Sequence, residues 1–82
     1  MSRRPSPVPL AYFDWCTRMG DRIRARRHAQ GLTLKAIARR SGIAIGTISQ
    51  IERAASAPSV SSLFAIARAL GAKVTDLLPE MA

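Results

Sequence analysis

The chain has 82 residues, a length that fits one small domain. Its 13 lysine and arginine residues outnumber its 5 aspartate and glutamate residues, and the net charge of +8 favours a polyanionic partner, although a basic surface that only aids solubility has the same composition. A single cysteine and the lack of an apolar run of ~20 residues argue against a disulfide scaffold, a cysteine-based metal site and a membrane span, and they indicate a reduced, cytoplasmic setting.

Residues 1–9 are rich in proline and arginine, which predicts a disordered basic arm. Arg3 and Arg4 would then reach along DNA into the minor groove. The alternative is a loose terminus without a role, and we favour it because short termini are usually untethered. No apolar core follows the two arginines, so the segment is not a secretory signal.

A long helix is predicted from about Leu10 to Gln30, with Pro9 at its start. Apolar residues recur at helical spacing and define its inward face: Phe13, Cys16, Met19 and Ile23. Gly20 could break this helix, in which case a second helix would begin near Thr17.

The first turns of this helix carry three of the four aromatic residues, Tyr12, Phe13 and Trp15. They either pack along the edge of a small core or form a subunit interface, where aromatic residues are enriched. The second half of the helix is basic, and we expect Arg22, Arg24 and Arg26 at the surface. A helix lying on a membrane is the less favoured reading, because the apolar face is narrow.

Two short helical patterns over residues 33–53 are separated by Gly42. The hydroxyl of Thr33 can cap the first, and Gly42 stands where a left-handed residue often ends a helix. The second pattern is marked by Ile43, Ile48 and Ile51. A turn of three or four residues forces the two helices to cross steeply, as in a helix-turn-helix.

The remainder of the chain predicts a loop and two more helices. Ser59 is a cap for a helix from Val60 to Leu70, which Gly71 ends. Its inward residues are Leu63, Ile66, Ala67 and Leu70. Thr75 is expected to cap a last short helix, Asp76 to Leu78, whose apolar residues pack on the core or contact a second subunit. The whole pattern is all-α, with five helices.

The ordered residues from Met19 to Leu78 resemble the lambda-repressor-like DNA-binding domains of the Cro/CI-type (XRE) family. The resemblance rests on Ala38, Gly42, Ile43, Ile48, Ile51 and Glu52-Arg53, then Ser56-Ala-Pro-Ser59, Leu63, Ile66-Ala-Arg-Ala-Leu-Gly71 and Thr75-Asp-Leu-Leu78. It implies a compact five-helix domain over residues 10–82 that binds DNA, with its helix-turn-helix at about 33–53.

The resemblance also implies two structural features. Arg27 stands where the family has an arginine that pairs with the glutamate matching Glu52, so this pair would join the first helix to the recognition helix. Family members usually have glycine where this chain has Ala54. A left-handed backbone there would cost an alanine ~1 kcal/mol, so the turn is either strained or different.

By helical period, Ile48 and Ile51 face the core and leave an outer face for the edges of bases in the major groove. Its residues are Ile45, Gly46, Thr47, Ser49 and Gln50. Gln50 matches adenine, because its amide offers a donor and an acceptor together. Ile45 either touches a thymine methyl group or folds back over Leu34 to cover the core.

The chain departs from the best-known family members at Leu34 and Ile45, where they have glutamine, and at Gly46. Their paired-glutamine contact therefore does not carry over, and Ala44 lacks the usual capping side chain. Base reading would depend on Gln50, Thr47 and DNA shape. Some members add a sensory cupin domain, but the sequence ends at Ala82, too early for one.

Phosphate contacts are expected to fix the register of the protein on DNA. The candidates are Thr33, Lys35, Arg39, Arg53 and Ser56. Arg39 and Arg40 are the weaker candidates, since either side chain could be solvated without a phosphate contact. The helix-turn-helix thus predicts a sequence-specific transcriptional regulator, in the role of a repressor, that binds double-stranded DNA as a homodimer on a palindromic operator. The alternative is an antitoxin or coactivator-like adaptor that binds protein. No catalytic constellation, cofactor or metal site is expected, so the chain is not an enzyme.

Overall fold

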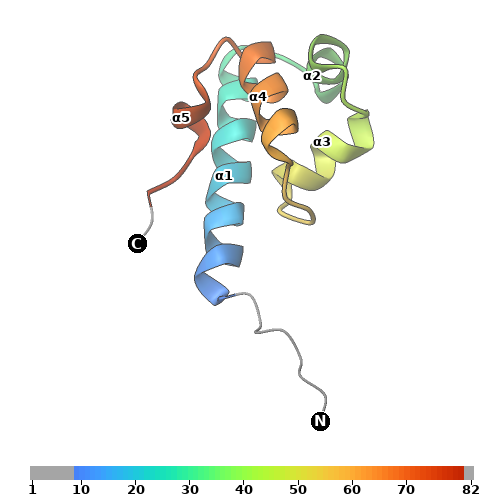
Figure 1. Ribbon diagram of the computed structural model, residues 1–82. Helices are drawn as coiled ribbons and strands as arrows, with labels where there is room; N and C mark the ends of the chain where they lie inside the picture. The colour runs from blue at the N-terminus through green and yellow to red at the C-terminus, as the bar shows by residue number, and fades with distance from the viewer. Residues whose placement is uncertain (1–8, 81–82) are drawn as a thin grey trace.

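The computed structural model describes residues 9–80, which form five helices and no strand, as the sequence predicts (Figure 1). The helices are α1 (Leu10–Ala29), α2 (Leu34–Ser41), α3 (Ile45–Glu52), α4 (Val60–Ala69) and α5 (Val74–Leu77). The predicted basic arm lies, apart from Pro9, outside the described residues.

Helix α1 is the longest of the described helices. It contacts α3 on one side and α5 on the other, and α2, α3 and α4 lie together beside it (Figure 1). The helix is continuous through Gly20, and the Thr17 hydroxyl donates to the Phe13 carbonyl within it rather than capping a new helix. The predicted single long helix is therefore confirmed, and a break at Gly20 is excluded.

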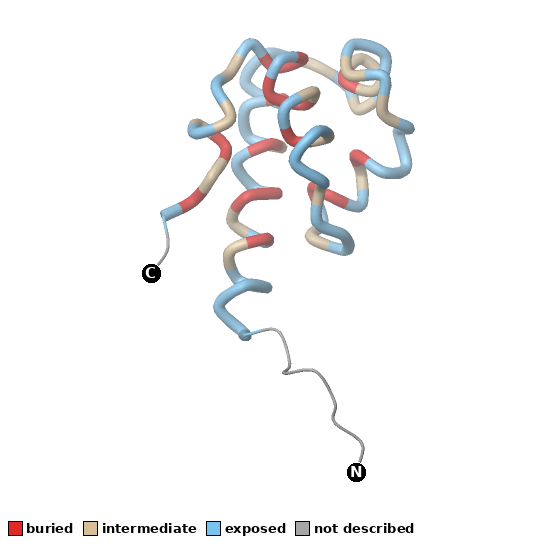
Figure 2. The backbone as a smooth tube through the Cα atoms, in the orientation of Figure 1, coloured by how far each residue is buried: buried red, intermediate tan, exposed pale blue. Residues whose placement is uncertain are grey.

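The first turns of α1 extend past the body of the domain, where Figure 2 shows an exposed end. Phe13 is 53% exposed, so its placement on the inward face was wrong. The helical spacing is correct, but none of the four other described helices covers that face at Phe13. The buried face begins at Cys16 and continues through Met19 and Ile23.

The core lies where the five helices converge. Its fully buried large side chains are Ile23, Ile37, Ile48, Ile51, Ile66 and Leu77. On α4, all of the predicted inward residues are buried, namely Leu63, Ile66, Ala67 and Leu70. Figure 2 shows these buried segments on the sides of the helices that face one another. One core thus unites all five elements, including the four-residue α5.

Local residues end the helices as the sequence predicts. The Thr33 hydroxyl accepts the Ala36 N–H at 3.0 Å at the start of α2, and the Ser59 hydroxyl accepts the Ser62 N–H at 3.1 Å at the start of α4. Gly42 ends α2 with φ at 77°. Each of these groups satisfies a backbone group that a helix end leaves without a partner.

The turn after α3 has the left-handed form despite the alanine. Ala54 has φ at 60°, which costs a residue with a Cβ atom about 1 kcal/mol. The Ala55 N–H donates to the Gln50 carbonyl at 2.8 Å and closes the turn. The strained alternative is therefore the one that occurs.

The last helix begins earlier than predicted. Lys73 is its N-cap residue, and the Asp76 carboxylate accepts the Lys73 N–H at 2.9 Å. Asp76 therefore acts from the third position of the helix, which moves the start back to Val74 and makes the prediction of a Thr75 cap wrong. The segment after α5 is held to α1 by Trp15, whose indole N–H donates to the Pro79 carbonyl at 2.8 Å.

Candidate nucleic-acid interface

The turn between α2 and α3 is three residues long and is fixed from within. The Gly42 N–H donates to the Ala38 carbonyl at 2.9 Å, and the Ser41 hydroxyl accepts the Ile43 N–H at 3.1 Å. Ile43 then packs against the core. A turn this short, anchored at both ends, sets α3 at a steep angle to α2 and gives the helix-turn-helix arrangement.

The inner side of α3 is held by packing and by a buried ion pair. Ile48 and Ile51 are buried in the core. Arg27 of α1 binds the Glu52 carboxylate through Nε at 2.7 Å and Nη2 at 2.9 Å, and its Nη1 donates to the Leu32 carbonyl at 2.9 Å. The structure thus pairs the two residues that the family resemblance joined. Hydrogen bonding to Glu52 raises the pKa of Arg27, which keeps its positive charge.

Two further residues of α1 meet the same end of α3. A Cβ atom on Gly20 would lie 2.6 Å from the Glu52 carbonyl oxygen, so only glycine allows this approach. Arg24 Nη1 donates to that carbonyl at 3.4 Å, where the negative end of the helix dipole favours a cation. Sequence reasoning missed both roles. The available signal was that Gly20, Arg24 and Arg27 fall on one face of a helix.

The outer side of α3 is open. Ile45 is 47% exposed and is not part of the core cluster, while Gly46, Thr47 and Gln50 are also exposed. Ser49 differs, because it is half-buried and its hydroxyl accepts from Arg53 Nε at 3.4 Å. Four of the five predicted base-reading residues therefore share an accessible face, and the fifth is partly covered. Ala44 makes no side-chain cap at the start of this helix.

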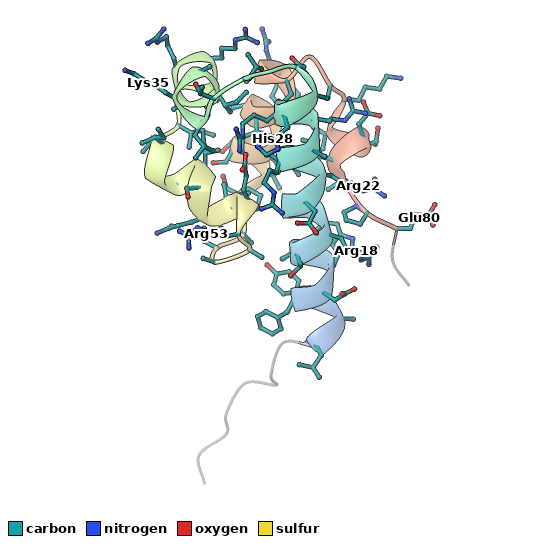
Figure 3. All side chains as sticks on the ribbon, turned by 180° about the vertical axis from the view of Figure 1, so that it is seen from behind. Arg18, Arg22, His28, Lys35, Arg53 and Glu80 are labelled. Atoms are coloured by element: carbon teal, nitrogen blue, oxygen red, sulfur yellow. The ribbon has the colours of Figure 1, made fainter. Side chains whose placement is uncertain are left out.

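The residues expected at phosphates have different roles in the free protein. Lys35, Arg39 and Arg53 are exposed, and Figure 3 shows Lys35 and Arg53 on the side of the molecule formed by α2 and α3. Thr33 is exposed, but its hydroxyl is engaged as the cap of α2. Ser56 is exposed in the loop after α3, where its N–H donates to the Gln50 carbonyl at 3.4 Å.

Comparison with known proteins decides the family. The model of the Helix-turn-helix family HTH_3 matches residues 23–77, which is most of the chain. The chain belongs to this helix-turn-helix family, of the XRE type. A search of curated proteins found no match.

Solved structures of several regulators resemble this helix-turn-helix protein. The restriction-modification controller protein C.AhdI from Aeromonas hydrophila is 27% identical, with a TM-score of 0.75, over 77% of this chain and 96% of its own. The clp gene regulator ClgR from C. glutamicum is 29% identical, with a TM-score of 0.72, over 88% and 86%. The hypothetical transcription factor NHTF from Neisseria is 25% identical, with a TM-score of 0.76, over 92% and 85%.

Three other arginines in the described part of the helix-turn-helix protein donate to backbone carbonyl groups of the protein itself. Arg22 Nη1 donates to the Leu78 carbonyl at 3.2 Å, Arg18 Nη2 to the Glu80 carbonyl at 3.1 Å, and Arg40 Nη1 to the Ala69 carbonyl at 3.3 Å. Figure 3 shows Arg18 and Arg22 across α1 from Arg53, beside the C-terminal segment. The net charge therefore overstates the number of cations available to a ligand.

The described residues hold neither a cluster of metal ligands nor a helix that could span a membrane. Between residues 9 and 80, no three His, Cys, Asp or Glu side chains gather as metal ligands would. None of the five described helices combines the length and apolar character that a membrane span requires.

Proposed function

We propose that the protein is a sequence-specific, DNA-binding regulator of transcription that places α3 in the major groove. The observation that carries the proposal is the contrast between the two sides of α3. Its inner side is fixed by Ile48, Ile51 and the Arg27–Glu52 pair, while its outer side is accessible and carries small or polar residues together with one apolar residue, Ile45. A rigidly held, slim helix fits a groove that is about 12 Å wide.

Family membership and the regulators among the similar structures support the same function in coarser terms, DNA binding in transcription. C.AhdI is a restriction-modification controller protein, and ClgR is a clp gene regulator. Neither protein identifies the operator of this chain, so the proposed base and phosphate contacts rest on the residues of this chain.

In the proposed complex, Gln50 reads an adenine through its amide, and Thr47 reads a neighbouring base edge. Ile45 touches a thymine methyl group, which its exposure favours over a role in covering the core. Gly46 lets the helix backbone approach the base pairs closely, since it adds no side chain. Ser49 has a smaller share, because it is half-buried and bonded to Arg53.

Lys35, Arg39 and Arg53 bind phosphates on either side of the groove, with Ser56 and the N-terminus of α2 at Thr33 supplying further contacts. We also propose that two copies bind a palindromic operator, because one domain of this type touches only a few base pairs and a two-fold pair doubles them. Repression follows if the operator overlaps a promoter, since bound protein then blocks access. This function places the protein with DNA in the cytoplasm.

The adaptor alternative retains one supporting observation, the exposed apolar side chain of Ile45 on α3. It predicts that the same face binds another protein and that DNA binding is weak and insensitive to changes on α3.

The test is the salt dependence of binding to fluorescent duplex DNA. Arg53→Ala should reduce the slope of log affinity against log salt by about 0.9, the value for one lost phosphate contact on B-DNA. Arg18→Ala is the matched control, because it removes the same charge from the opposite side of α1 (Figure 3). An equal effect of the two variants, or none from either, would contradict the proposed face.

A further inference from the structure

An apolar groove runs between the first half of α1, the start of α4 and α5. Its volume is about 380 Å³, and its nine lining residues include Tyr12, Trp15, Val60, Val74 and Leu78. None of the nine carries a charge. The floor reaches the core at Met19 and Leu63, and the loop before α4 closes part of the wall with Ala57 and Pro58.

Exposed apolar side chains cluster around this groove. The described residues include six large hydrophobic side chains that are exposed, and five of them lie on α1 or α4: Leu10, Tyr12, Phe13, Val60 and Phe64. Val60 is 87% exposed and lines the groove, and Phe64 follows one turn later on the same face. Clustered apolar surface of this kind marks an interaction site, whereas single exposed residues do not.

The protruding end of α1 supplies a shape that fits such a groove. Leu10 is 84% exposed and lies one turn from Phe13, at an end of α1 that no other element within residues 9–80 covers (Figure 2). The Phe13 ring meets the ring of Tyr12 edge-on, with centroids 5.6 Å apart, and Tyr12 lines the groove. Each chain therefore presents an apolar projection directly beside an apolar hollow.

Charge decides which partner suits this surface. Duplex DNA fits this surface poorly, because none of the nine lining residues carries a positive charge that could neutralise a phosphate. A second copy of this chain repels the first through a charge of +8 on each, and two copies can therefore meet most easily at a surface without charges. Here the surface without charges also holds both halves of a self-complementary contact, as a two-fold interface requires.

We propose that the groove is the interface between two copies of the chain, with Leu10 and Phe13 of each copy seated in the groove of the other. The proposal rests on the proposed function in one respect, since it assigns a surface to the operator-bound dimer. It leaves the outer face of α3 open, because the groove is lined by residues of α1, α4, α5 and their flanking segments, including Ala57 and Pro58 of the loop before α4, and by none of α3.

Sedimentation equilibrium of the full chain tests the interface. The wild-type protein should form a reversible dimer, and Phe13→Glu and Val60→Lys should each weaken it about tenfold or more, as truncation of an interface hot spot does. Both positions are exposed, so the monomers should keep the wild-type circular dichroism spectrum and melting temperature. Ile45→Glu, which places a charge on an exposed apolar residue of α3, should leave the dimer unchanged.

Mixing the two charged variants gives the decisive result. In their mixed dimer, one contact pairs the new glutamate with the new lysine, and the other pairs wild-type Phe13 with wild-type Val60. The mixture should therefore dimerise more strongly than either variant alone. A monomeric wild-type protein, variants that dimerise normally, or a mixture no better than its components would each overturn the interface.

Binding to a duplex with a single half-site separates this proposal from the proposed function. If the protein is monomeric but binds the half-site, the interface is wrong and the DNA-binding role stands. If the dimer forms but no duplex binds, the interface stands and the DNA-binding role is wrong.

Discussion

Gly20 of α1 lies against the backbone carbonyl of Glu52 at the end of α3. A Cβ atom at position 20 would come within 2.6 Å of that carbonyl oxygen and within 2.7 Å of the Ile51 carbonyl oxygen. One turn and two turns further along α1, Arg24 and Arg27 bind the carbonyl and the carboxylate of the same glutamate. Three residues of α1 thus meet α3 at one residue, Glu52, in addition to the packing of Ile48 and Ile51 in the core.

Replacing Gly20 by alanine tests this contact. The clashing atoms are backbone, which cannot rotate away as a side chain can, so α3 must shift. We expect Gly20→Ala to lower the free energy of unfolding by about 2 kcal/mol, because overpacking outweighs the ~1 kcal/mol that alanine gains over glycine within a helix. Urea denaturation followed by circular dichroism measures the change.

Gly46→Ala is the matched control for this substitution. A Cβ atom on Gly46 meets nothing within 4 Å, and the residue lies in α3 without a positive φ. Alanine there should raise the free energy of unfolding by up to about 1 kcal/mol. If both variants are stabilised alike, the close approach of α1 to Glu52 is not a constraint on the fold.

Removing the charge of one partner of the Arg27–Glu52 ion pair should destabilise the domain. Glu52→Gln keeps the shape of the side chain but leaves a buried guanidinium without its counter-charge. We expect the free energy of unfolding to fall by about 3 kcal/mol, and Arg27→Met to cost a similar amount. The double variant Arg27→Met/Glu52→Met should lose much less than the sum of the single variants, because apolar residues can replace a buried pair.

A thermodynamic cycle over these variants measures the coupling between the two side chains. Exposed ion pairs such as Arg18–Asp14 offer a comparison, since solvent screens them and their contribution is small. A loss from Glu52→Gln no larger than that from Asp14→Asn would show that the buried pair does not hold α3.

Ala54→Gly should stabilise the domain. Ala54 has φ at 60°, a conformation that glycine adopts without the strain of a Cβ atom. Relief of about 1 kcal/mol of strain is partly offset by the greater flexibility of glycine in the unfolded chain, so we expect a gain of about 0.5 kcal/mol. The melting temperature should rise by a few degrees, whereas a fall would mean that the left-handed turn is not strained.

Features set by neighbouring residues could be predicted from the sequence. Thr33, Gly42 and Ser59 act on groups within a few residues, so their roles at helix ends follow from local chemistry alone. The inward face of α4 follows from helical period in the same way. The start of α5 was misplaced because two residues, Thr75 and Asp76, could each satisfy its first N–H groups, and only the structure shows that Asp76 does.

Features set by distant contacts could not be predicted. Gly20 looks like a helix break until α3 is placed beside it, 32 residues along the chain. The helical period of apolar residues cannot show that α1 extends beyond the other helices at Phe13, which leaves that residue exposed. Nor does composition reveal which arginine side chains are hydrogen-bonded within the protein. Arg22 and Arg40 donate to carbonyl groups on α5 and α4, which lie far away in sequence. The outer face of α3 was predictable in outline, but the partial burial of Ser49 was not.

Selection of bound sites from random duplex DNA tests the central claim most directly. The wild-type protein should enrich a two-fold-symmetric site, and Gln50→Ala, which removes an exposed amide from α3, should relax one position in each half of that site. Folded protein that enriches no site at low salt, or a Gln50→Ala variant that selects the wild-type site unchanged, would contradict reading of DNA by the outer face of α3.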